Sequence, residues 1–106
     1  MPWYLYGAHF FGAAFLANSL PHLIAGVSGN RLPTPFASPP FRGFSSPSVN
    51  TVWALINLAA AYLLLVRPNT VDLRNWTDAV VCFAGFGLMA FFVAGSLTRI
   101  RAQNAS

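Results

Sequence analysis

The chain is expected to be an all-α membrane protein with three transmembrane helices and a long loop, rich in proline and phenylalanine, between the first two. Two observations indicate this class. Hydrophobic residues make up 56% of the 106 residues and charged residues only 8%, whereas soluble domains carry roughly 25% charged residues. The apolar residues also gather into three stretches, each close to the roughly 20 residues that a helix needs to cross a bilayer. Residues 1–106 are therefore expected to form a single transmembrane domain.

The first stretch runs from about residue 3 to residue 27 without one formal charge. No basic side chain precedes it, unlike the n-region of a cleaved signal peptide, so it is expected to be retained as a helix. Trp3, Tyr4 and Tyr6 at its start suit the membrane interface. Pro21 removes one backbone hydrogen bond and predicts a kink.

The second and third spans are expected over about residues 49–66 and 79–97. Both are apolar throughout, and arginine or proline residues follow the second at Arg67 and Pro68. Trp76 lies just before the third, where an aromatic ring marks the interface. All eight charged residues fall outside the three stretches.

The loop over residues 28–48 is long for a connection in so small a protein. Its five prolines exclude regular helix, and its three phenylalanines have no place in a polar linker. We expect an ordered, extended segment that packs across the helix ends or lies in the headgroup layer. A flexible linker remains the alternative. Arg31, Phe36 and Arg42 are its candidate contact residues.

The arginines predict the orientation in the membrane. Three spans place four arginines on the side of the first loop and two on the other side, where the negative charges of Asp72 and Asp78 offset the positive charge of the arginines. The positive-inside tendency then predicts the N-terminus outside and the C-terminus in the cytoplasm. The absence of lysine and glutamate, with abundant alanine and arginine, suggests a bacterial inner membrane on composition alone. The four arginines are Arg31, Arg42, Arg99 and Arg101.

Polar side chains inside the spans are costly in lipid and therefore mark candidate sites. Spacings of three and four residues place those of the first span on one helix face, and a similar stripe follows the second span. Counting about 1.5 Å per residue brings both stripes, and the end of the third span, to a common depth. The predicted cluster beneath the loop comprises Asn18, Ser19, His22, Asn50, Trp53, Asn57 and Arg99.

Two interpretations of this cluster stay open. It is a binding pocket for a lipid headgroup or small polar ligand, with His22 able to change its charge near neutral pH. Alternatively, it is structural, with hydrogen bonds between helices worth roughly 0.6 to 2 kcal/mol each. The structural interpretation is favoured, because asparagine and histidine without a carboxylate make a poor acid–base pair.

Other chemistry has weaker support. Ser19 beside His22 resembles a nucleophile and base but lacks an acidic group in any span. His9 and His22 lie about 20 Å apart along one helix, and Cys82 is the single cysteine, so neither a metal nor a cofactor is expected. The arginines flank apolar segments in ones and twos, which argues against nucleic acid as a partner.

Small residues four apart let helix backbones approach closely. Three helices leave several such pairs without an internal partner, which predicts a homo-oligomer or a place in a larger membrane complex. The first functional hypothesis is therefore a non-enzymatic bundle or accessory subunit, surrounded by membrane lipids. The alternative is a lipid- or small-solute-binding or transport protein, or a membrane enzyme, that uses the cluster around His22. The pairs are Ala8 and Gly12, Ala13 and Ala17, and Ala90 and Ala94.

Overall fold

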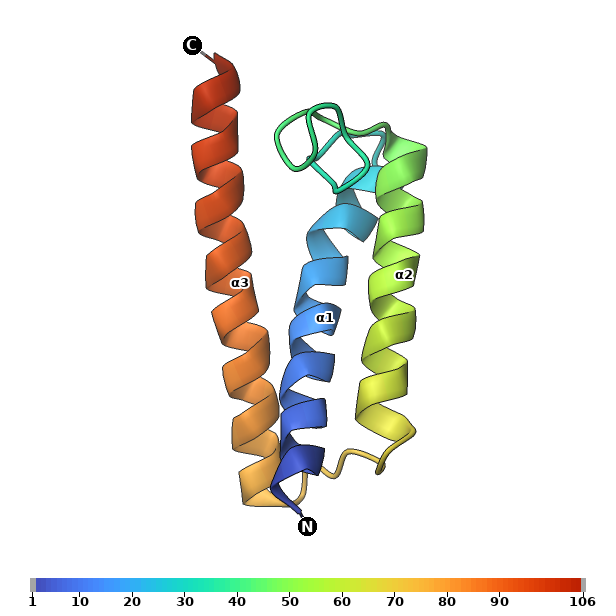
Figure 1. Cartoon of the computed structure of the whole chain (residues 1–106), viewed down its shortest axis with the longest axis vertical. Helices are drawn as coiled ribbons and strands as arrows, with labels where there is room; N and C mark the ends of the chain where they lie inside the picture. Colours follow the sequence, from blue (N-terminus) through green and yellow to red (C-terminus); the bar gives the residue numbers. More distant parts are fainter. Residues whose placement is uncertain (1, 106) are drawn as a thin grey trace.

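The chain folds into three long helices (Figure 1). The computed structural model describes residues 2–105. Helix α1 spans Trp3–Val27, α2 spans Pro47–Val66 and α3 spans Trp76–Ala105, with no strand among the described residues. Each helix is long and apolar enough to cross a membrane, which confirms the expected fold class.

Side-chain caps fix where α2 and α3 begin. Ser46 accepts a hydrogen bond from the Val49 amide at 3.2 Å, and Pro47 occupies the first turn of α2, where its missing N–H is not needed. The Asn75 side chain accepts from the amide of Asp78 at 3.2 Å and caps α3. Helix α3 thus begins before the apolar run at residues 79–97, and it also continues beyond that run at its C-terminal end.

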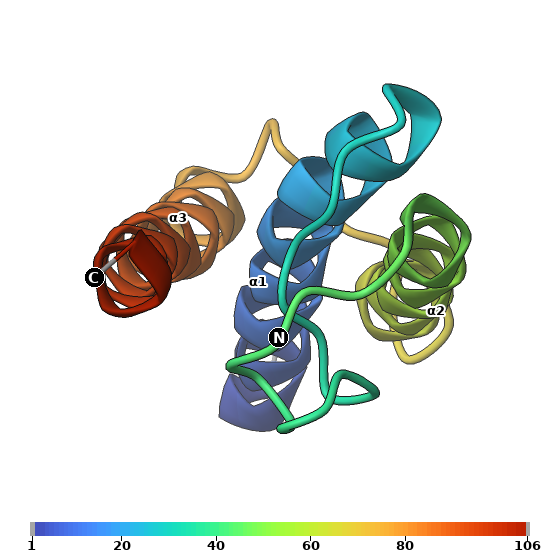
Figure 2. The ribbon, with the colours of Figure 1, turned by 90° about the horizontal axis from the view of Figure 1, so that it is seen from above.

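Helix α1 lies between the other two, which do not pack against each other within the described residues (Figure 2). Its buried positions are mostly small: Ala13, Ala14, Ala17 and Ala25 are all less than 10% exposed. Small side chains on several sides of one helix let both neighbours approach its backbone. Two of the three small-residue pairs seen in the sequence are thus used inside the monomer.

Helix α3 touches α1 closely only near the N-terminal end of both helices. A Cβ added at Gly85 would collide with the carbonyl oxygen of Phe10, so this position has room for glycine alone. From there α3 leans away from α1 toward its C-terminal end, as Figure 1 shows. The two helices therefore diverge on the side of the loop.

The segment between α1 and α2 folds back over the ends of these two helices (Figure 1). The Ser45 amide donates to the carbonyl of Leu32 at 3.0 Å, and the Thr34 and Ser45 hydroxyls lie 2.6 Å apart. The Phe41 amide donates to the carbonyl of Thr34 at 2.9 Å, and Phe41 adopts a left-handed backbone with φ of 63°. The loop thus has its own hydrogen-bonded structure.

Candidate functional site

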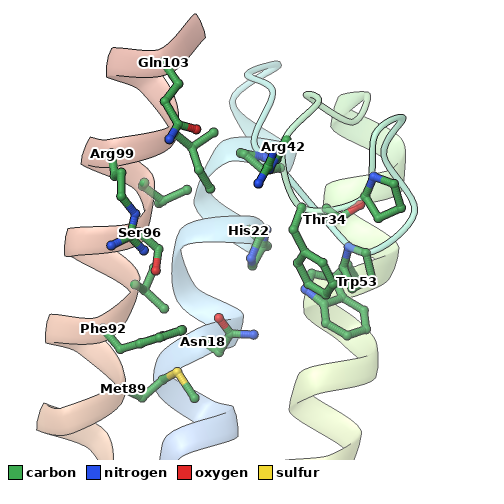
Figure 3. A pocket seen from close by; sticks show the side chains of 17 residues that line it. Asn18, His22, Thr34, Arg42, Trp53, Met89, Phe92, Ser96, Arg99 and Gln103 are labelled. Carbon is green, nitrogen blue, oxygen red and sulfur yellow. The ribbon is translucent and has the colours of Figure 1, made fainter.

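A cavity of about 480 Å³ lies between α1, α3 and the loop (Figure 3). Ligand pockets in proteins measure roughly 300 to 1,000 Å³, so this one is large enough for a small molecule or part of a lipid. Helix α1 contributes Asn18 and His22, and α2 contributes Trp53. The loop and one face of α3 form the remaining walls.

The α3 wall changes from apolar to polar along the helix. Its lining residues recur every three or four positions and so share one face. Met89, Phe92 and Val93 line the deeper part, whereas Ser96, Arg99 and Gln103 line the part nearer the loop. Leu97 and Ile100 are apolar residues that lie between these polar positions on α3 and also line the cavity. The wall is therefore apolar toward the middle of the bundle and combines polar with apolar side chains toward its end.

The α1 wall is held by hydrogen bonds to α2. The Asn18 amide donates to the side-chain oxygen of Asn57 at 3.0 Å, and the Asn57 amide donates to the Trp53 carbonyl at 2.8 Å. Asn57 is 1% exposed and lies behind the cavity wall. This chain fixes the rotamer of Asn18 from the side opposite the cavity.

Asn50 fixes both the loop and the tautomer of His22. Its amide nitrogen lies 3.1 Å from the carbonyl oxygens of Leu32, Ser45 and Ser46, so it is the donor in these contacts. Its side-chain oxygen must then accept the hydrogen bond from His22 Nδ1 at 2.8 Å. The neutral His22 ring therefore carries its proton on Nδ1.

The other ring nitrogen of His22 faces the cavity. His22 is 5% exposed, and within residues 2–105 its Nε2 atom has no hydrogen-bond partner. Every fully buried side-chain nitrogen or oxygen among these residues does have a hydrogen-bond partner. Both conditions hold only if Nε2 reaches the cavity surface. In the neutral ring this atom accepts a hydrogen bond, and in the charged ring it donates one.

Two arginines flank the mouth of the cavity from different elements. Arg42 comes from the loop and Arg99 from α3, on opposite sides of the cavity in Figure 3. The Asn104 side chain donates to the carbonyl of Arg42 at 3.2 Å and ties α3 to the loop there. In the part of the chain that the structure describes, neither arginine forms an ion pair with an acidic side chain.

The predicted site residues divide into three groups. Asn18, His22, Trp53, Arg42 and Arg99 line the cavity. Ser19, Asn50 and Asn57 are buried behind it. Arg31 is exposed away from the cavity, and Phe36 packs edge-on against Trp53 with ring centres 5.6 Å apart, on the outer side of α2.

Ser19 and His22 do not form the nucleophile–base pair considered from the sequence. The Ser19 hydroxyl donates to the carbonyl of Leu16 at 2.6 Å, one turn back along the helix. His22 is engaged by Asn50 instead. This hydroxyl is therefore engaged by the backbone of its own helix.

A second polar cluster, at the opposite end of the bundle, was not predicted. His9 Nδ1 lies 2.6 Å from a carboxylate oxygen of Asp78, and His9 Nε2 lies 2.6 Å from the carbonyl oxygen of Asn69. The second oxygen of Asp78 accepts from the Asp72 amide at 2.8 Å. Both ring nitrogens face oxygen atoms, so Nε2 donates to the Asn69 carbonyl and a second proton lies between Nδ1 and the Asp78 carboxyl group.

Asp78 belongs to α3, although it lies one residue before the span expected over residues 79–97. It is 2% exposed and lies in the first turn of α3, where the helix dipole favours a negative charge. The apolar run begins one residue later, which placed Asp78 outside the span. The spacing of Asn75 and Asp78, a cap residue and an acid three positions on, is the pattern that marks the true helix start.

The described residues hold no group of three or more His, Cys, Asp or Glu side chains arranged to bind a metal. Comparison with protein-family models, with curated proteins and with solved structures finds no match for this chain.

Proposed function

We propose that this chain is a small non-enzymatic membrane protein that holds an amphiphilic molecule, a lipid or a lipid-like solute, in the cavity between α1, α3 and the loop. One observation carries the proposal: the α3 wall is apolar throughout at Met89, Phe92 and Val93, and polar groups enter it only nearer the loop. These are Ser96, Arg99 and Gln103, which alternate there with Leu97 and Ile100. An amphiphile that lies along the membrane normal has the same order of polarity, with its chain toward the bilayer centre and its headgroup toward the interface.

The packing of the helices supports entry from the lipid. Within the described residues α2 and α3 do not contact each other, and the close attachments of α3 to α1, the His9–Asp78 pair and the contact at Gly85, lie toward the end opposite the loop. A molecule in the adjacent leaflet therefore reaches the cavity beside α3 without passing through a closed bundle. A hydrogen bond from the Asn104 side chain to the Arg42 carbonyl joins α3 to the loop at the mouth.

Filling the cavity tests the proposal. The protein is purified in a mild detergent, and the molecules that remain bound are identified by native mass spectrometry and by extraction into organic solvent. Ser96→Trp introduces a bulky ring into the cavity wall, whereas Ala94→Trp places the same ring on the exposed outer face of α3. We expect the first variant to lose the retained amphiphile and the second to keep it. Equal retention in both variants would show that the cavity is not the binding site.

A second candidate function is a subunit of an oligomer or of a larger membrane complex. The pair Ala90 and Ala94 lies exposed on α3, unlike the two pairs on α1, and only 6% of the apolar window of α3 is buried inside the structure. Native mass spectrometry of the wild type gives the subunit count. We expect Ala90→Leu to lower that count if this face joins two copies, and to leave it unchanged if lipid covers the face.

The orientation and membrane follow as parts of the same proposal. The loop and the C-terminal end of α3 lie at one end of the bundle (Figure 1) and carry four arginines, which supports placing that end in the cytoplasm of a bacterial cell. Reporter domains fused to the C-terminus, one active only in the cytoplasm and one only outside, test this orientation. Activity of the outside reporter would reverse it.

A further inference from the structure

The charges of the chain are divided between the two ends of the bundle. Arg31, Arg42, Arg99 and Arg101 lie at the end that holds the cavity mouth, and no aspartate or glutamate accompanies them. The two acidic residues of the chain both lie near the turn between α2 and α3, about 30 Å away at about 1.5 Å per residue of α3. The mouth of the cavity is therefore positively charged without internal neutralisation.

Two of these four arginines belong to the cavity itself. Arg42 and Arg99 line it from the loop and from α3, while Arg31 and Arg101 do not. Arg42 follows Phe41, whose left-handed backbone is uncommon for a bulky residue and is held by its hydrogen bond to Thr34. Asn104 binds the Arg42 backbone from α3. The two guanidinium groups are thus brought to one opening by contacts between the loop and α3.

From this placement we infer that the cavity is selective for an anionic headgroup, with phosphate or carboxylate oxygens bound between Arg42 and Arg99. This inference deepens the proposed function and rests on it. Guanidinium groups match the oxygens of such anions with paired hydrogen bonds. No carboxylate lines the cavity, so the ammonium group of a zwitterionic lipid finds no counter-charge there.

The unpaired Nε2 of His22 adds a second contact deeper in the cavity. His22 is 5% exposed, and within residues 2–105 this nitrogen has no hydrogen-bond partner, so it is a polar atom at the cavity surface that is available to a ligand. In the neutral ring it accepts from a hydroxyl or from a protonated acid. A ligand with anionic oxygens at the arginines and a hydroxyl below them satisfies both contacts.

The test compares two double variants with the same loss of charge. Wild type, Arg42→Gln with Arg99→Gln, and Arg31→Gln with Arg101→Gln are placed in nanodiscs of phosphatidylcholine. Binding of phosphatidic acid is then titrated against phosphatidylcholine with the same acyl chains. We expect the cavity double variant to bind phosphatidic acid roughly 10- to 30-fold more weakly, since each arginine near the surface contributes about fivefold. The other double variant should stay within about twofold of wild type.

The outcomes separate this inference from the proposed function. Equal loss in both double variants, or equal binding of the two lipids by wild type, would overturn anion selectivity while leaving amphiphile binding intact. A third outcome concerns the place of binding. If the cavity double variant loses its selectivity for phosphatidic acid but Ser96→Trp binds both lipids as wild type does, the cavity is not the binding site. Inorganic phosphate is titrated in parallel: competition for the arginines supports the anion site, and binding of phosphate without any retained lipid would identify a free anion as the ligand and overturn the amphiphile.

Discussion

His9 in α1 and Asp78 in the first turn of α3 form a buried ion pair, with 2.6 Å between Nδ1 and Oδ1. The two residues are 69 positions apart, and the pair fixes the start of α3 against α1 at the end of the bundle opposite the cavity. Because α3 diverges from α1 beyond Gly85, this fixed end sets the direction in which the cavity wall runs. The polar cluster that was missed in the sequence thus positions the cavity.

Asp78→Asn is expected to destabilise the protein strongly. The substitution removes the carboxyl group that lies 2.6 Å from His9 Nδ1, and breaking a buried pair by removing one partner costs about 3 to 5 kcal/mol in proteins. Thermal unfolding in detergent, followed by circular dichroism, measures the loss. Asp72→Asn is the matched control, because Asp72 is exposed and its side chain accepts one local backbone hydrogen bond.

Removing both partners separates charge from packing. His9→Leu combined with Asp78→Leu leaves no unpaired charge, so the double variant should unfold at a higher temperature than Asp78→Asn alone. An Asp78→Asn protein as stable as Asp72→Asn would contradict the ion pair.

Gly85→Ala is expected to disturb the contact between α1 and α3. The added Cβ would meet the Phe10 carbonyl oxygen, which is backbone and cannot rotate away, so the helices must separate at a cost of about 1 to 3 kcal/mol. Gly87→Ala is the control on the same helix, since nothing lies within 4 Å of its added Cβ. Alanine favours helix over glycine by roughly 0.5 to 1 kcal/mol. Unfolding temperatures should therefore fall for the first variant and hold or rise for the second.

The sequence was sufficient for the fold class because lipid imposes a simple rule. An uncharged apolar run of this length is stable only as a helix in hydrocarbon, so the three spans follow from the positions of the charges. Depth counting also brought Asn18 and His22 near Asn50 and Asn57, and the structure joins these residues in pairs. These predictions needed only helix geometry and the cost of burying polar groups.

The role of His9 and Asp78 did not follow from that rule. Hydropathy marks the hydrocarbon region and not the ends of the helix. Asp78, one residue before the apolar run, was therefore placed outside the third span and was not expected to be buried. The cavity was also beyond sequence reasoning, since it depends on the angle at which α3 leaves α1. That angle is set by Gly85 and by the ion pair together.

Asn50→Leu is expected to loosen the loop while leaving the helices in place. Leucine has a similar size but cannot donate to the carbonyls of Leu32, Ser45 and Ser46, and an unsatisfied buried acceptor costs about 1 to 3 kcal/mol. Hydrogen exchange of the amides over residues 32–46 measures the effect, and these amides should exchange faster. Ser48→Ala, at an exposed position of the same helix end, should leave the exchange unchanged. Unchanged exchange in Asn50→Leu would mean that Asn50 does not hold the loop.

His22→Ala distinguishes a structural role of the polar cluster from a binding role. The substitution removes the donor to Asn50 and should lower stability by about 1 to 3 kcal/mol in either case. Asn50→Ala breaks the same hydrogen bond from the other side, but Asn50 does not line the cavity. Asn50→Ala also loses the contacts with the loop, so it is the more severe structural change, and only His22→Ala removes a group that lines the cavity.

The deciding measurement is the amount of amphiphile retained per folded molecule, read by native mass spectrometry in the same detergent. If His22 Nε2 contacts the ligand, His22→Ala retains less than Asn50→Ala, and His22→Gln, whose amide oxygen can accept a hydrogen bond, restores part of the difference. If the cluster only joins helices, His22→Ala retains at least as much amphiphile as Asn50→Ala, and His22→Gln affects stability alone. Equal retention would confine His22 to the packing of α1 against α2 and leave the arginines as the polar part of the site.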